Sequence, residues 1–259
     1  MNDSPKELFA LDLGNSTCRM GIFRGSRISD DAFVDTDRFI DNPQILLERT
    51  GNGSSPLCYC SVCPPAEIEL VKWAIASNKE LFCLTNRTCL DFPIAYPCPE
   101  EIGPDRIANS FAVHRTSELP VIVIDVGTAT TFDVVNEEDG YLGGVIAPGP
   151  QGFLDFLHQN TALLPKVAYG SKAPESPIGK TTSDAMLLGA RLGFGPMITG
   201  ILNRLKKEVK ESCGKAPLVI LAGGAARHLD LENFEHRPFL TLEGIALAYL
   251  ENTLTQVSS

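Results

Sequence analysis

The sequence has 259 residues, of which 44% are hydrophobic and 21% are charged, and its formal net charge is −10. This length allows a large core in one or two domains. We expect no binding to nucleic acid, because such binding depends on clustered Lys and Arg and the sequence has no basic stripe. The N-terminus lacks the pattern of a signal peptide, and no uninterrupted apolar run reaches the ~18 residues of a membrane span. We therefore expect no membrane association, and a cytoplasmic location with the eight cysteines kept reduced.

The first predicted strand covers residues 8–13 (LFALDL) and enters a tight turn at Gly14. Residues 18–24 alternate in polarity like the return strand of a hairpin. The same phrase recurs at residues 121–135 (VIVIDVGTATTFDVV), again as an apolar strand, Asp-x-Gly, hydroxyl residues and a β-branched strand. Such repetition predicts a duplicated architecture with a ligand between the halves.

The remaining elements mix strands and helices, which predicts an α/β fold with a mixed sheet in each half. Among them is a long helix at about residues 183–210, for which Thr182 or Ser183 is the predicted N-cap residue. In chain order, the predictions are an apolar segment at 57–62, a helix at 66–78, an extended segment from Pro93 to Pro104, a helix from about Asp105, a strand and glycine-proline loop at 141–152, a long helix at about 183–210, a strand at 216–226 and a final helix at 242–254.

Two aspartates close the duplicated strands, Asp12 in LDLGNST and Asp125 in IDVGTATT. A carboxylate beside a glycine turn can hold a cation, while turn amides and hydroxyls can bind phosphate oxygens. Each copy alone could be an ordinary Asx turn. Two copies, both followed by hydroxyl residues, favour a small-molecule kinase whose ATP phosphates lie against these turns.

A second candidate site is the segment Gly103-Pro104-Asp105-Arg106. Asp105 could simply cap a helix, and Arg106 could be a solvated surface charge. In the functional interpretation, Asp105 accepts a proton from an attacking hydroxyl and Arg106 binds a substrate carboxylate through its planar fork. Gly223-Gly224, after the apolar VILA, could admit a flat nucleoside base.

Cys58, Cys60 and Cys63 form a C-x-C-x-x-C pattern that could bind zinc with a fourth ligand. The favoured interpretation is different: these thiols behave as small apolar side chains of a buried strand, because no second paired cluster or nearby histidine appears.

The ordered set of motifs resembles the type III pantothenate kinases, the bacterial enzymes of the first step of coenzyme A synthesis. The resemblance rests on DLGNST, IGPDRIAN, DVGTATTFD, GGVIAPG and IGKTT and runs from about Leu8 to Ala248. It implies membership of the acetate kinase, sugar kinase, Hsp70 and actin superfamily. The implied fold is two actin-like (ribonuclease H-like) halves, residues 1–116 and 117–259, with mixed five-stranded sheets flanked by helices and a ligand cleft between them.

The resemblance also implies roles for individual residues, in an ATP-dependent phosphorylation of pantothenate to 4'-phosphopantothenate. Asp105 is the proton acceptor, Asp125 binds a monovalent cation, K⁺ or NH₄⁺, and Mg²⁺ accompanies ATP near Asp12. The enzyme is expected to be a homodimer in which Thr182 acts at the partner's pantothenate site. The implied ATP ligands are Asp12, Gly14, Asn15, Ser16, Thr17, Arg19, Thr128, Gly223 and Gly224, and the implied pantothenate ligands are Tyr96, Gly103, Pro104, Asp105, Arg106 and Thr182.

Three positions depart from the family pattern. Ser16-Thr17 replaces the commoner Thr-Asn or Thr-Ser after Asn15, and Ala222 replaces a hydroxyl residue before the glycine pair. Thr181 stands where Asn usually precedes the threonine, which leaves the choice between Thr181 and Thr182 as substrate ligand open. Two alternatives to this enzyme remain: a non-catalytic regulator related to transcription accessory factors, and another small-acid kinase or hydrolase of the same superfamily.

Overall fold

The structure is a computed structural model that describes residues 7–51, 55–226 and 234–257. It divides into two compact units that interleave along the chain. The first unit comprises Met1–Glu118, Val135–Leu142 and Phe239–Ser259, and the second comprises Leu119–Val134 and Gly143–Pro238. The predicted division into two halves, residues 1–116 and 117–259, stays a prediction. In the structure, the C-terminal segment packs with the first unit.

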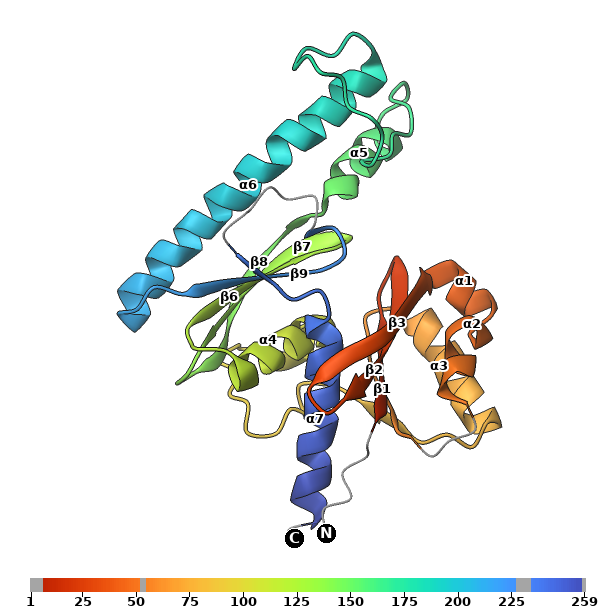
Figure 1. Ribbon diagram of the computed structural model, residues 1–259. Helices are drawn as coiled ribbons and strands as arrows, with labels where there is room; N and C mark the ends of the chain where they lie inside the picture. The colour runs from red at the N-terminus through yellow and green to blue at the C-terminus, as the bar shows by residue number, and fades with distance from the viewer. Residues whose placement is uncertain (1–6, 52–54, 227–233, 258–259) are drawn as a thin grey trace. The chain divides into compact units, whose positions relative to one another are not determined.

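The first unit is built on a five-stranded sheet of order β3-β2-β1-β4-β5, of which β1, β2 and β3 are labelled in Figure 1. Strand β2 runs antiparallel to both β1 and β3, whereas β4 is parallel to both β1 and β5. The central strand is almost entirely buried, because its apolar residues meet helices on both faces. The strands are β1 (Leu8–Leu13), β2 (Thr17–Arg24), β3 (Arg27–Asp35), β4 (Leu57–Ser61) and β5 (Leu81–Cys83).

Helices cover both faces of this sheet (Figure 1). Helices α4 and α7 pack together, and Gly244 allows their close approach because a Cβ there would overlap the backbone of Ala108. The helices of this unit are α1 (Thr36–Asp41), α2 (Gln44–Leu47), η1 (Glu48–Thr50), α3 (Pro64–Ala76), η2 (Pro99–Glu101), α4 (Pro104–Thr116) and α7 (Leu240–Val257).

The second sheet has the order β10-β9-β6-β7-β8, which repeats the order of the first sheet with β6 in the place of β1. Strand β9 is parallel to β6, as β4 is parallel to β1, and Asp125 pairs with Ala222 as Asp12 pairs with Cys60. The predicted duplication is therefore visible in strand order and register. The strands are β6 (Val121–Val126), β7 (Ala129–Asn136), β8 (Gly140–Pro148), β9 (Leu218–Ala222) and β10 (Glu235–His236).

Two helices belong to the second unit, α5 (Pro150–Gln159) and the long α6 (Thr182–Cys213). They pack together through a cluster that includes Leu154, Met186 and Leu187. The expected N-cap at Thr182 or Ser183 is wrong: Thr181, one residue before Thr182, is the N-cap, and its hydroxyl accepts from the Asp184 N–H at 3.1 Å.

Among the described residues, α6 alone is long and apolar enough to cross a membrane, judged by length and composition. Its apolar section is interrupted by Arg191, whose Nη2 donates to the carbonyls of Tyr169 and Ser171 at 3.0 and 2.7 Å. Phe194, Ile198 and Leu202 follow on the same helix and are buried. Packing inside the second unit therefore accounts for part of the apolar character of α6, since 39% of its apolar window is buried.

The predicted fold class is confirmed, with two mixed five-stranded sheets flanked by helices. One segment differs from its prediction. The glycine-proline loop predicted up to residue 152 begins a helix at Pro150, since proline is well suited to the first helical position.

Candidate active site

Asp12 lies at the end of β1, half-buried, where the chain leaves the core. The strand register places it between Arg19 on β2 and Cys60 on β4, and the Cys60 thiol donates to Asp12 Oδ1 at 3.6 Å. Arg19 in turn donates to Asp31 Oδ2, from Nη2 at 2.7 Å and from Nε at 3.2 Å. Its charge is therefore balanced within the first unit, and a contact from Arg19 to ATP stays a prediction.

The turn that follows Asp12 is tight and presents its tip to solvent. Gly14 N–H donates to the Thr17 carbonyl at 3.1 Å. A Cβ at Gly14 would lie 2.7 Å from that same oxygen, so only glycine fits here without a backbone shift. Residues 15–17 are exposed, which leaves their backbone and hydroxyl groups open to a ligand such as phosphate.

The Cys60 thiol lies near both the Asp12 turn and the Asp105 carboxylate. Cys60 is fully buried, and its pKa is raised well above the usual 9.0, first by burial and then by the nearby carboxylates of Asp12 and Asp105. Both carboxylates therefore lie in the neighbourhood of one thiol within the first unit.

Asp105 occupies the first turn of α4, and the interpretation of this residue as the helix N-cap is wrong. Gly103 is the N-cap, Pro104 is the first helical residue, and Asp105 Oδ1 accepts from the Arg106 N–H at 2.8 Å. Burial raises the pKa of the Asp105 carboxyl, while its interactions with Arg106 oppose that rise. A raised carboxyl pKa is the property that suits a general base.

Gly103 makes room for this carboxylate. A Cβ at Gly103 would lie 2.5 Å from Asp105 Oδ1 and 3.6 Å from Val62 Cγ1. A side chain at position 103 would therefore displace the carboxylate that the sequence predicts to be catalytic.

Two side chains of the predicted pantothenate site, those of Tyr96 and Arg106, lie beside a residue that sequence reasoning missed, Tyr141. Its ring centre lies 6.0 Å from that of Tyr96, and the Arg106 guanidinium lies 5.8 Å from it. The backbones are also joined, because Ala95 N–H donates to the Tyr141 carbonyl at 2.9 Å. Tyr141 is fully buried and thus orders the loop that carries Tyr96 beside the start of α4. Its neighbours in sequence, YLGG, gave no signal of this contact.

In the second unit, Asp125 ends β6 and is half-buried. The backbone of Gly223 lies against the Asp125 carboxylate. Its φ is +85°, and a Cβ there would overlap Asp125 Oδ1 and the backbone of Val126. The sequence predicts a contact of Gly223-Gly224 with a nucleoside base, and this stays a prediction. The structure shows in addition that Gly223 leaves the Asp125 carboxylate its space, whereas Gly224 has open surroundings.

The turn after Asp125 is held by the loop between β8 and α5. Gly149 N–H donates to the Thr128 carbonyl at 3.1 Å, and Thr130 Oγ1 donates to the Pro148 carbonyl at 3.3 Å. Thr128 itself is exposed. The second turn therefore resembles the first in having a half-buried aspartate and an exposed tip.

Thr182 is exposed at the start of α6. Because the Thr181 hydroxyl serves as the helix cap, the Thr182 hydroxyl is the better candidate of the two for a ligand contact. Its assignment to pantothenate stays a prediction.

The C-x-C-x-x-C pattern belongs to the core. Cys58 and Cys60 are fully buried on β4, Cys63 is buried at the N-cap of α3, and all three are free thiols. Among the residues that the structure describes, no group of three or more His, Cys, Asp or Glu is placed to hold a metal ion.

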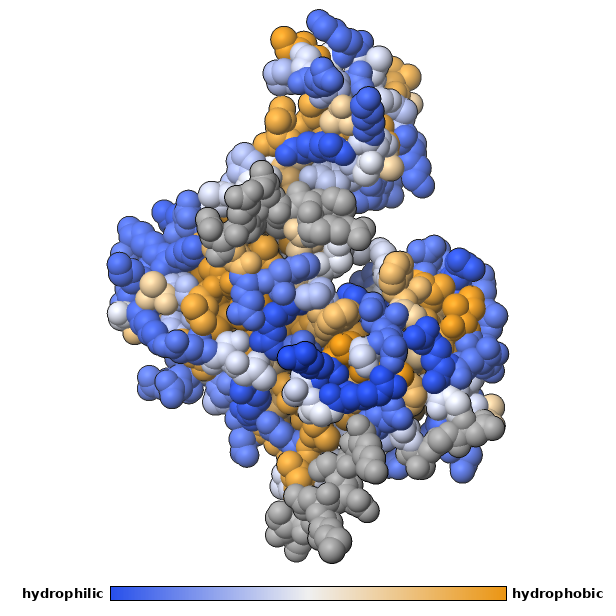
Figure 2. Space-filling model, viewed as in Figure 1, coloured by the Kyte–Doolittle hydropathy of each residue, from blue (hydrophilic) through white to orange (hydrophobic). Residues whose placement is uncertain are grey.

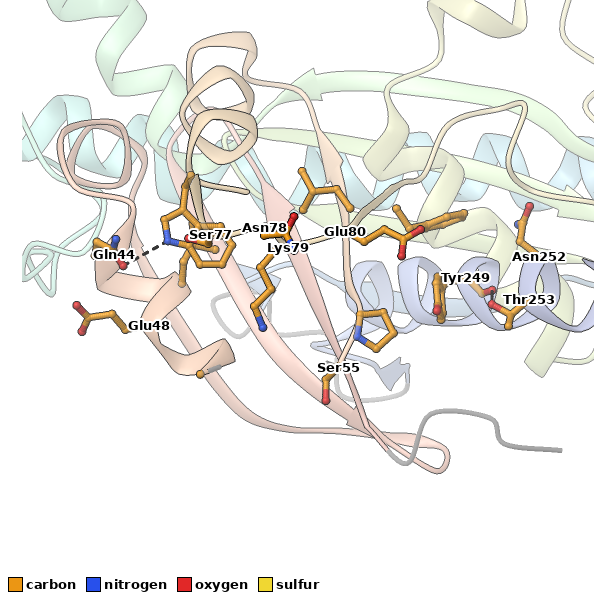
Figure 3. Close-up of a pocket in the computed structure, with 16 residues that line it drawn as sticks. Gln44, Glu48, Ser55, Ser77, Asn78, Lys79, Glu80, Tyr249, Asn252 and Thr253 are labelled. Atoms are coloured by element: carbon orange, nitrogen blue, oxygen red, sulfur yellow. Dashed lines mark hydrogen bonds between the residues drawn. The ribbon is translucent and has the colours of Figure 1, made fainter. Parts of the chain in front are cut away.

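A separate groove of about 950 Å³ opens in the first unit beside β5 (Figure 3). Its walls include Gln44, which accepts from Trp73 Nε1 at 3.3 Å, and Lys79, Tyr249 and Asn252. None of the predicted site residues lines it. The groove is therefore distinct from the surroundings of the Asp12, Asp105 and Asp125 carboxylates.

The two sheets repeat one strand order, and each has an Asp-x-Gly turn with an exposed tip after its central strand, which defines an internally duplicated α/β protein. Comparison with known proteins identifies the family. The type III pantothenate kinase family profile matches residues 8–204. The chain is 32% identical to the type III pantothenate kinase of Bacillus cytotoxicus over 264 residues, covering 96% of this chain and 98% of the relative. It is 33% identical to that of Myxococcus xanthus over 259 residues, covering 95% and 98%.

The chain belongs to the type III pantothenate kinase family. The predicted resemblance and the predicted kinase class are confirmed at this level. A solved structure from Campylobacter jejuni, of a protein assigned to the Baf family of transcriptional activators, is also similar, with a TM-score of 0.59 and 19% identity over 95% of this chain and 100% of that one. At this identity the likeness shows the fold alone and does not favour a regulatory function.

Proposed function

We propose that this chain transfers the γ-phosphoryl group of ATP to the primary hydroxyl of pantothenate, giving 4'-phosphopantothenate, the first step of coenzyme A synthesis. The observation that carries the mechanism is the Asp105 carboxylate, which burial gives a raised pKa and which Gly103 leaves unobstructed. In the proposed reaction, Asp105 orients the hydroxyl and accepts its proton as the oxygen attacks phosphorus.

Arg106 and Tyr96 are the proposed pantothenate ligands, together with Gly103, Pro104 and Thr182. Pantothenate carries a carboxylate, and an arginine fork binds a carboxylate through two parallel hydrogen bonds. The contacts of Tyr141 with Tyr96 and Arg106 support this role, because they hold both side chains near the start of α4. Positioning of this kind supplies much of the rate enhancement in phosphoryl transfer.

The proposed ATP ligands are the Asp12 turn of the first unit and, in the second unit, Thr128 and the Gly223-Gly224 pair. Asp12 would hold the Mg²⁺ that accompanies ATP, since Mg²⁺ prefers carboxylate and phosphate oxygens. The exposed tip after Gly14 supports a phosphate contact. When bound, Mg²⁺ neutralises charge on the phosphates.

Asp125 is the proposed ligand of a monovalent cation, K⁺ or NH₄⁺. The donor set fits such an ion: one carboxylate, with the Val126 carbonyl oxygen close to the same Gly223 backbone. No larger group of acidic or thiol ligands adjoins it among the described residues. A single carboxylate with neutral oxygens suits a weakly bound cation of low charge.

A homodimer is proposed on the apolar surface of the second unit. Phe156 of α5 is 65% exposed, Leu163 is 91% exposed, and Leu192 of α6 is 57% exposed. Figure 2 shows apolar residues reaching the surface in the α5 and α6 part of the molecule. Exposed apolar side chains gathered in one region are typical of a surface that binds another protein. We propose that Thr182, at the start of α6, contributes to the partner's pantothenate site.

We further propose a cytoplasmic enzyme that binds neither membrane nor nucleic acid. All eight cysteines are free in the structure, as expected in a reducing compartment. The net charge of −10 opposes binding to nucleic acid phosphates.

The direct test is a coupled ADP assay on the purified protein, with and without pantothenate, in potassium buffer and then in sodium buffer. We expect ADP formation that requires pantothenate, an equal amount of 4'-phosphopantothenate by mass spectrometry, and higher activity in potassium. ADP formation that does not depend on pantothenate would instead support a hydrolase of the same superfamily.

A further inference from the structure

Thr36 is a buried polar residue next to the Asp12 turn that neither the sequence motifs nor the proposed reaction uses. It is the first residue of α1 and is 3% exposed. Its hydroxyl donates to the Gly14 carbonyl at 2.7 Å, and its N–H donates to the Ser16 carbonyl at 3.1 Å. Thr36 therefore binds the backbone on both sides of Asn15, at the exposed tip of the turn.

These two bonds determine which way the tip amide points. In a trans peptide the C=O and the N–H point in opposite directions. The Gly14 carbonyl is held toward the buried Thr36 hydroxyl, so the N–H of the next residue, Asn15, points away from Thr36. Because Asn15 is exposed, that direction leads to the side of the turn where a phosphate oxygen can accept from it.

The Thr36 hydroxyl is itself fixed by a third contact. Cys18 Sγ donates to Thr36 Oγ1 at 3.6 Å. Burial raises the pKa of Cys18 to about 12, so the thiol stays protonated and keeps its hydrogen for this bond. The Thr36 hydroxyl thus accepts one bond and donates another, which leaves it a single orientation toward Gly14.

We propose that Thr36 is a positioning residue for nucleotide binding, holding the Gly14–Ser16 backbone so that the exposed Asn15 N–H meets the phosphates of ATP. The inference rests on the proposed role of the Asp12 turn. It assigns to Thr36 no contact with substrate, since its side chain faces the backbone of the turn.

The chain offers a matched control in Thr50. Thr50 is also a buried threonine of the first unit, 5% exposed, and its hydroxyl donates to the Leu47 carbonyl at 2.8 Å. Replacing either threonine by valine keeps the size and the branched Cβ and removes a buried hydroxyl. At position 50 this removes the bond to Leu47, and at position 36 it removes the bond to Gly14 and the weak bond from the Cys18 thiol. Only Thr36 is bonded to the phosphate turn.

The experiment measures ADP affinity by calorimetry and the KM values for MgATP and pantothenate in Thr36→Val, Thr36→Ser and Thr50→Val. For Thr36→Val we expect ADP affinity and the KM for MgATP to worsen about threefold to tenfold, as for one net hydrogen bond of about 0.7 to 1.4 kcal/mol. The KM for pantothenate should change less than about twofold. Thr36→Ser, which keeps the hydroxyl, and Thr50→Val should both bind ADP like the parent protein.

Equal ADP affinity in Thr36→Val and Thr50→Val would overturn the inference. If Thr36→Val does not fold, Thr36→Cys replaces it, because a thiol is a weaker donor of similar size. Thr36→Cys must then bind ADP at least about twofold more weakly than Thr36→Ser, and equal affinity again refutes the role. An Asp12→Asn variant separates the two hypotheses: normal ATP use there overturns the assignment of the turn, whereas a defect there with normal Thr36→Val overturns only the role of Thr36.

Discussion

Replacing Asp105 by Asn should separate the chemistry of the proposed base from its structural contacts. Asn has nearly the same shape, and its Oδ1 can still accept the 2.8 Å bond from the Arg106 N–H, so the start of α4 should stay intact. The variant loses the negative charge of the carboxylate and with it the ability to accept the substrate proton. General-base catalysis typically contributes about 10²- to 10⁴-fold, which corresponds to about 2.7 to 5.4 kcal/mol in the barrier. We expect kcat to fall by this factor while KM for MgATP changes little.

The same substitution should stabilise the protein at neutral pH. Burial raises the pKa of the Asp105 carboxyl in the folded chain above its ordinary value of 3.8, so the folded state favours the protonated form. The stability that this preference supplies is present below pH 3.8 and is lost as the pH rises through the folded pKa. Asparagine does not ionise and therefore avoids this loss. Asp105→Asn should unfold at a higher temperature than the parent protein at pH 7, by a margin that shrinks toward pH 4.

The assay combines steady-state ADP formation with thermal unfolding followed by circular dichroism at pH 7 and at pH 4. Asp37→Asn is the control, because Asp37 also lies in the first turn of a helix but is exposed. That control should keep full activity and lose a few tenths of a kcal/mol, as expected for a charge at a helix N-terminus. A kcat within about tenfold of the parent in Asp105→Asn would show that Asp105 is not the base. If Asp105→Asn unfolds at a lower temperature than the parent protein at pH 7, the buried charge of Asp105 does not destabilise the fold.

Three further predictions concern the second unit and the thiols. Gly223→Ala should destabilise the protein by at least about 1–3 kcal/mol in chemical denaturation, because its φ of +85° is strained for alanine and the Cβ would overlap Asp125 Oδ1, whereas Gly224→Ala should lose less than about 1 kcal/mol. Asp125→Ala should abolish the difference between potassium and sodium buffers in the ADP assay, and a potassium preference that survives would remove Asp125 from the cation site. Brief alkylation of the native protein should label the partly exposed Cys213 and spare Cys58, whose thiol is buried and has a raised pKa, as peptide mass spectrometry can check; early labelling of Cys58 would contradict its place in the core.

The parts of the fold that could be predicted from sequence are those with a local pattern. The apolar strand, aspartate and glycine of β1 and β6 form a local pattern, and the strand register then shows the same duplication. The long α6 was also predictable, except for its cap. The choice between Thr181 and its neighbours depends on which hydroxyl reaches the Asp184 N–H, a matter of backbone geometry that residue type alone does not decide.

In the candidate site, too, some residues could be found from local motifs and others could not. The carboxylates Asp12 and Asp105 stand beside glycines and could be found from motifs. Tyr141 and Thr36 could not, because each acts on residues distant in the chain, Tyr141 on Tyr96 and Thr36 on Gly14. Their roles follow from tertiary contacts, and a tyrosine or threonine in a strand or at a helix start has no pattern that distinguishes such a role.

The interleaving of the two units has a consequence for how the protein is made. The core of the first unit is completed by α7, whose Leu242, Ile245 and Ala246 are buried, and α7 is the last element of the chain. During synthesis the ribosome adds about 5–20 residues per second. The first sheet must therefore wait several seconds, with its α7 face uncovered, while residues 119–238, most of which belong to the second unit, are made. The nascent N-terminal half is thus the stage at which this enzyme depends most on protection from aggregation, and deletion of α7 should leave the first unit unable to fold.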